Sequence, residues 1–127
     1  MPSASLTFRY ALLCDDVRRE DNGKLIIIGM YGGDIALPML PSSIFASLVA
    51  AFDASEKQSE KINLTVTLNA KPMVAGDISV EIAGAGLAHI ILPSIPLNFD
   101  KEGTMVVTLK TTDGMEHHAW TGKVRVK

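Results

Sequence analysis

Two kinds of residue in this chain could do chemistry: three histidines as metal ligands and one cysteine as a nucleophile. His117 and His118 are adjacent, and neighbouring side chains on a strand point to opposite faces, so both cannot bind one ion from regular geometry. If His118 shares the face of Trp120, it could meet His89 across a sheet. Because no further ligand with suitable spacing accompanies them, we predict core or edge histidines and no metal site.

The cysteine lies in an acidic stretch that also carries basic residues. Cys14 is followed by Asp15 and Asp16, whose negative charges raise the pKa of a thiol instead of producing the thiolate that a nucleophile needs. The same carboxylates could gather around calcium, but Arg18 and Arg19 oppose a divalent cation there. We therefore predict an inert packed cysteine beside a solvated charged turn, with no catalytic residue and no cofactor.

The composition limits the classes of partner. The 127 residues suffice for one domain, which we place at residues 5–127. With 12 Lys and Arg against 14 Asp and Glu, the chain lacks the basic surface of a nucleic-acid-binding protein. The single cysteine fits a reducing compartment, and the longest apolar run, residues 44–52, is too short to span a membrane. We expect a cytoplasmic protein that binds neither nucleic acid nor membranes.

Apolar and polar residues alternate with the period of β-strands through most of the chain. A hairpin is predicted within residues 11–38, because Asn22-Gly23 tolerates the positive φ angles of a tight turn between two apolar runs. Pro93 and Pro96 are expected to interrupt strand pairing. The predicted strands are 8–14, 24–30, 44–52, 62–70, 78–82, 87–92, 105–109 and 120–126.

The segment at residues 44–52 is the ambiguous element. Ile44, Leu48 and Phe52 would share one face of a helix that Ser42 or Ser43 could cap. The near-continuous apolar run also suits a strand buried on both faces, which is the interpretation we favour, with the helix left open. The expected fold is all-β: an antiparallel β-sandwich, immunoglobulin-like or similar, with about eight strands.

The order of the strands predicts two unlike ends. If the strands alternate in direction, connections near 15–24, 53–60, 84–86 and 111–114 emerge at one end, which is charged. Connections near 31–43, 70–77 and 93–103 emerge at the other end, which is apolar. These loops either seal the core or offer an adaptable surface to a protein partner. The candidate partner-binding residues are Tyr31, Met39, Leu40, Met73, Val74 and Ile95.

The segment ALLCDDVRREDNGKLIIIGMYGGDIALP resembles the opening of a bacterial family of small uncharacterised proteins, a domain of unknown function. The family pattern is a strand end A-L-x-x-D-x-V, a turn N-G-K-L, then I-G-x-[YF]-G and a proline. The matching residues are Ala11, Leu12, Asp15, Val17, Asn22, Gly23, Lys24, Leu25, Ile28, Gly29, Tyr31, Gly32 and Pro38. The resemblance implies an immunoglobulin-like or similar sandwich, without an assigned activity or cofactor.

Two functions from different classes follow from these observations. The first is a non-catalytic interaction or structural module that binds a protein partner or a second copy of itself, through apolar loops or a sheet edge. The alternative is a small-molecule-binding or metal-dependent enzyme of a β-barrel type that uses His89 and His118. We favour the interaction module, because no catalytic arrangement is present in the sequence.

Overall fold

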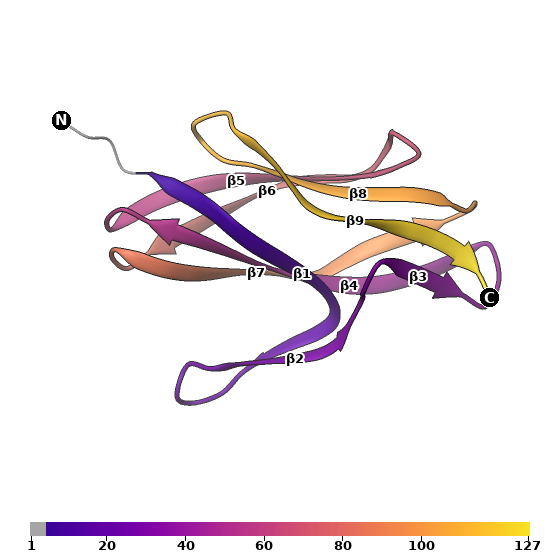
Figure 1. Cartoon of the computed structure of the whole chain (residues 1–127), viewed down its shortest axis with the longest axis horizontal. Helices are drawn as coiled ribbons and strands as arrows, with labels where there is room; N and C mark the ends of the chain where they lie inside the picture. The colour runs from indigo at the N-terminus through magenta and orange to yellow at the C-terminus, as the bar shows by residue number, and fades with distance from the viewer. Residues whose placement is uncertain (1–4) are drawn as a thin grey trace.

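Two β-sheets pack face to face in a sandwich (Figure 1). The computed structural model describes residues 5–127, which contain nine strands and no helix, and therefore no helix able to cross a membrane. One sheet has four strands in the order β2-β1-β4-β7, and the other has five in the order β3-β9-β8-β5-β6. The strands are β1 (Leu6–Arg19), β2 (Leu25–Met30), β3 (Asp34–Leu37), β4 (Ser42–Ala54), β5 (Gln58–Leu68), β6 (Lys71–Ile82), β7 (Gly86–Phe99), β8 (Gly103–Lys110) and β9 (Glu116–Val126).

The ambiguous apolar segment is a strand, because it forms part of β4 in the middle of the four-stranded sheet. β4 pairs with β1 on one side and β7 on the other, and residues 46–52 are all buried. Its inward residues, among them Leu48 and Phe52, join the core that fills the space between the sheets. Residues of the other parity point outward, and in the centre of the strand Ser47, Val49 and Ala51 are also buried. The helix alternative is therefore wrong.

The predicted hairpin is present, and it is longer than expected. The N–H of Glu20 donates to the carbonyl of Lys24 at 2.8 Å, and Gly23 adopts a φ of 88° in the turn. β1 pairs with β4 from Leu6 to Cys14, and beyond Cys14 it pairs only with β2. Residues 15–30 thus form a hairpin arm, which Figure 1 shows below the sandwich, away from the five-stranded sheet.

Three details of the predicted sandwich are corrected. A ninth strand, β3, pairs in parallel with β9, so the sandwich is not purely antiparallel. The expected loop at residues 70–77 is a tight turn at Asn69 and Ala70, which have φ values of 52° and 67°, and β6 begins immediately after it. The interruption predicted at Pro93 is present, since Pro93 and Ser94 have no partner on β4, but pairing resumes at Ile95 and continues through Pro96. β7 tolerates both prolines because it is an edge strand with a bulge.

The turns gather at two opposite ends, as the alternation of strand directions predicts. Figure 1 shows the β1–β2, β4–β5, β6–β7 and β8–β9 turns at the end where β1 begins. The β3–β4, β5–β6 and β7–β8 connections lie at the opposite end, with the C-terminus. This end is not apolar as predicted, because Asp100, Lys101 and Glu102 form the β7–β8 connection and Lys71 follows the β5–β6 turn. The long strands between them carry the faces on which a partner could bind.

Candidate functional site

The structure does not unite the six residues predicted to bind a partner. Ile95 points into the core and is only 6% exposed. Tyr31 follows β2, away from the end of the sandwich, and its hydroxyl donates to a carboxylate oxygen of Asp15 at 2.7 Å. Met73 and Val74 belong to β6, and the exposed residue of the six is Met39, at 62%. The partly buried members pack against the core, as sealing residues do; they are Tyr31, Leu40, Met73 and Val74.

Two shallow depressions lie between the open edges of the two sheets, where β6 faces β7. The larger, of about 480 Å³, is lined by Met73 and by residues of the β3–β4 and β7–β8 connections. The smaller, of about 230 Å³, lies beside Val74 and Ile95. Neither depression contains a histidine, a cysteine or a pair of carboxylates in its lining. The ionisable side chains in the linings are Lys71, Asp100 and Lys101 in the larger depression and Asp77 in the smaller one.

The histidines do not assemble into one site. His118 is opposite Thr108 on the exposed outer face of the five-stranded sheet, whereas His117 points inward and stacks on Phe8 with ring centroids 5.2 Å apart. His89 lies on the outer face of the other sheet, where its Nε2 is 2.9 Å from the hydroxyl of Tyr10. His89 and His118 are thus on opposite sides of the sandwich. In residues 5–127, no three metal-ligating side chains come together.

Cys14 is buried in the four-stranded sheet, with its Sγ 3.5 Å from the carbonyl of Ser47. Burial raises the pKa of the Cys14 thiol, and the nearby charge of Asp15 raises it further. Burial also raises the pKa of Tyr31 to about 12, with the hydrogen bond to Asp15 adding to the effect. Neither group is prepared to act as a nucleophile or a base, since both hold their protons more firmly than usual.

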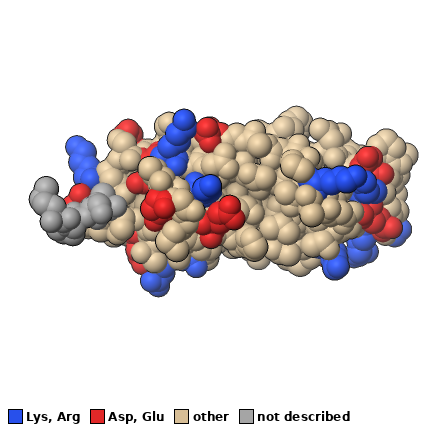
Figure 2. All heavy atoms as spheres, turned by 90° about the horizontal axis from the view of Figure 1, so that it is seen from above, with Lys and Arg blue, Asp and Glu red and all other residues tan. Residues whose placement is uncertain are grey.

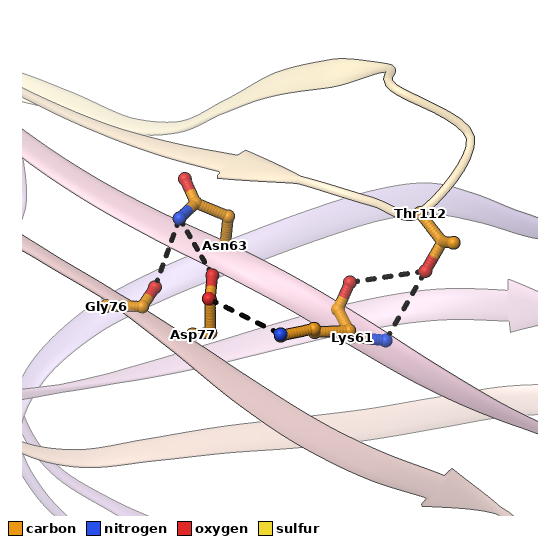
Figure 3. A network of polar contacts seen from close by, with 5 residues as sticks. All are labelled: Lys61, Asn63, Gly76, Asp77 and Thr112. Carbon is orange, nitrogen blue, oxygen red and sulfur yellow. Dashed lines mark hydrogen bonds and ion pairs between the residues drawn. The ribbon is translucent and has the colours of Figure 1, made fainter.

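The outer face of the five-stranded sheet is polar and satisfies its own hydrogen bonds. Figure 3 shows Asn63 on β5 donating to the carboxylate of Asp77 on β6 at 2.9 Å, while Lys61 forms an ion pair with the same carboxylate. Thr112, in the β8–β9 turn, bonds to the backbone of Lys61. Seen from this side, the charged side chains gather toward the two ends, and the band between them is uncharged (Figure 2). Its outward positions include Thr65 and Thr67.

The outer face of the four-stranded sheet is mostly apolar on β4 and β7, and polar groups lie at its margins. Ser43 donates to Asn98, and on the arm Asp16 and Arg18 form an ion pair at 3.2 Å, opposite Ile28 and Ile26. β7 carries no charged residue, and β4 carries only Asp53, which forms an ion pair with Arg9 at 2.9 Å. Phe45 projects outward from β4 and is 68% exposed. Nine large apolar side chains of residues 5–127 are exposed, and six belong to this sheet, on the side opposite the core. We call these six the outer apolar face: Tyr10, Ile26, Ile28, Met30, Phe45 and Leu87.

The register of the strands places these residues on one side. Tyr10 and His89 flank Ala51 of β4, and their hydrogen bond passes over that small residue. On the arm, Met30 is opposite Cys14 and Ile28 is opposite Asp16, and directly opposed residues share a face. The sequence carried one signal of this surface: β4 and β7 are apolar at outward as well as inward positions. Periodicity alone cannot distinguish a strand buried on both faces from a strand with an exposed apolar face.

Comparison with known proteins gives a family and no activity. No curated protein matches this chain. A family model described as a family of unknown function, DUF6941, matches residues 9–124, which is far more of the chain than the N-terminal segment that suggested such a family. The chain therefore belongs to this family of unknown function, DUF6941.

Proposed function

We propose that this chain is a non-catalytic interaction module that binds another protein chain through the outer apolar face. The observation that carries the proposal is the contrast between the two sides of the sandwich. One side carries threonine, asparagine and paired charges, while the other carries exposed aromatic and aliphatic side chains from Leu87 near one end of β4 to Phe45 near the other and along the arm. Exposed apolar patches that exceed a few hundred Å² mark interaction sites.

The size and chemistry of the outer apolar face suit a protein partner. At on the order of 100 Å² each, the six exposed side chains total roughly 600 Å², compared with roughly 800 Å² per partner in a standard interface. They are spread along the sheet, because Leu87 is opposite Asp53 near one end of β4 and Phe45 lies near the other end. Phe45 and Tyr10 are rigid aromatic anchors of the kind that dominate binding energies. The Arg9–Asp53 ion pair at one end provides a polar rim.

The proposal keeps the interaction role predicted from the sequence and changes its location. The six residues predicted from the sequence mostly contact the core, so we propose the outer apolar face in their place as the main docking surface. We also propose an immunoglobulin-like topology, supported by the strand orders β1-β4-β7 and β5-β8-β9, which follow the Greek-key order of that fold. A reducing, cytoplasmic location is supported by the one cysteine, which is buried.

Site-specific photo-crosslinking in the native host tests the proposed surface. A photoreactive phenylalanine replaces Phe45 in one variant and Thr121 in a matched control, since Thr121 is exposed on the opposite outer face. We expect adducts of defined mass from position 45 and few from position 121. Equal yields at the two positions, or none at position 45, would contradict the proposal.

A further inference from the structure

We infer that the β2 edge of the four-stranded sheet pairs with β2 of a second copy of this chain, forming an antiparallel dimer with a two-fold axis at Ile27. This inference rests on the proposed interaction function and names the first partner as the chain itself. The pairing would join two four-stranded sheets into one, with both outer apolar faces on the same side.

The four sheet edges differ in their protection against pairing. β7 contains Pro93, Pro96 and a bulge, and β6 contains Pro72 together with the charged Asp77 and Glu81. β3 spans only four residues. Short length, proline, bulges and charge are the devices that block edge-to-edge association. β2 has the sequence LIIIGM, without a proline or a charged residue, so among the four edges it is the unprotected one.

The free N–H and C=O groups of β2 point in the direction that edge pairing requires. The bond from the Glu20 N–H to the Lys24 carbonyl makes that pair a hydrogen-bonded pair of the hairpin. Hydrogen-bonded and non-hydrogen-bonded pairs alternate along an antiparallel ladder, and the register is unbroken from Arg19↔Leu25 to Asp16↔Ile28. Leu25 and Ile27 therefore direct their N–H and C=O groups away from β1, toward the open edge.

The side chains of β2 are self-complementary about Ile27. A two-fold axis at this residue places Ile26 opposite Ile28 of the second copy, and Ile28 opposite Ile26, on the outer apolar face. The exposed fractions are 43% for Ile26 and 42% for Ile28, so both have surface to bury. Within β2 no charge opposes a like charge in this register, because the strand has none.

The contact area between the two β2 strands determines how stable we expect the dimer to be. A two-fold axis at Ile27 pairs the five residues from Leu25 to Gly29 with their counterparts, which cover roughly 17 Å of strand. Their contact area falls below the roughly 800 Å² per partner of a standard interface. We therefore expect a dimer that dissociates on dilution. Such an interface would strengthen wherever a second protein bridges the two outer apolar faces.

The test is sedimentation equilibrium of the full chain over a wide concentration range, with a pair of charged variants. Ile26→Lys/Ile28→Lys and Ile26→Glu/Ile28→Glu each place like charges opposite one another in the dimer, and we expect both to be monomers. An equimolar mixture of the two places Lys opposite Glu, and we expect the dimer to return. Met39→Lys/Met115→Lys, which adds the same charge at exposed residues elsewhere, should dimerise like the parent.

Ile27→Pro is a second block, because it removes an edge donor without removing a bond to β1. Far-UV circular dichroism confirms that each variant is folded. A parent chain that stays monomeric throughout, or folded charged variants whose mixture does not pair, overturns the inference. If the chain is a monomer but still forms cross-links from position 45, the proposed function stands and the dimer is refuted. If the chain dimerises but forms no such cross-links, the dimer stands and docking at the outer apolar face is refuted.

Discussion

Two phenylalanines on β4 should respond in opposite ways to the same truncation. Phe52 is fully buried, with its ring against Phe8 at a centroid distance of 5.5 Å, whereas Phe45 projects from the other face and is 68% exposed. Removing a buried phenylalanine side chain costs about 3 to 5 kcal/mol through lost burial and the cavity left behind. Phe52→Ala should therefore lower the free energy of unfolding by about 4 kcal/mol, and Phe45→Ala should change it by less than about 0.5 kcal/mol.

Urea unfolding followed by circular dichroism measures both effects on the same strand. With a slope of roughly 2 kcal/mol per molar urea, Phe52→Ala shifts the midpoint down by roughly 2 M, and Phe45→Ala leaves it nearly unchanged. If Phe45→Ala destabilises the isolated chain as much as Phe52→Ala, then Phe45 belongs to a folded interior and not to an open surface. That result would refute the reasoning on which the outer apolar face depends.

Three further predictions concern the arm and its surroundings. Gly29→Ala should lower the free energy of unfolding by about 1 to 3 kcal/mol in the same urea assay. Gly29 has a φ of +66°, and a Cβ there would collide with the carboxylate of Asp15. Gly32→Ala, with open space around it, is the control and should be nearly neutral. A thiol reagent should modify Cys14 only as the chain unfolds, since burial and the charge of Asp15 raise its pKa; rapid labelling of the folded chain would count against this. The pKa of Tyr31 is about 12 in the folded state, above its ordinary value of 10.0. The contribution of Tyr31 to the free energy of unfolding should therefore be complete below about pH 10 and fall as the pH rises toward 12. Tyr31→Phe should abolish this loss.

The sequence predicts the strands better than their pairing. The turn at Asn22 and Gly23 could be recognised because its chemistry is local. The four residues of β3 are too few to give a periodic signal, and their parallel pairing with β9 joins segments far apart in the chain. Pairing is interrupted at Pro93 as predicted, but Pro96 is paired, because a proline that ends a central strand is tolerated on an edge and edge position depends on the whole sheet.

The candidate surface was harder to predict than the fold for a related reason. Alternation correctly indicated the polar outer face of β5, where Asn63 and Thr65 separate inward residues. On β4 the outward Phe45 and the inward Phe52 look alike in sequence, and only the position of the second sheet distinguishes them. Whether Met73, Val74 and Ile95 face solvent or the core likewise depends on packing across the sandwich, which a single sequence does not specify.

Three methionines with nearly equal exposure allow the docking surface to be located directly. Met30 on the outer apolar face is 60% exposed, Met39 in the β3–β4 connection is 62% exposed, and Met115 in the β8–β9 turn is 58% exposed. Peroxide footprinting of the chain in extracts of its native host, compared with the dilute isolated chain, reports which of the three is covered. We predict selective protection of Met30 in the extract. Equal oxidation of all three, or protection of Met39 instead, would contradict the claim that the outer apolar face is where this chain binds.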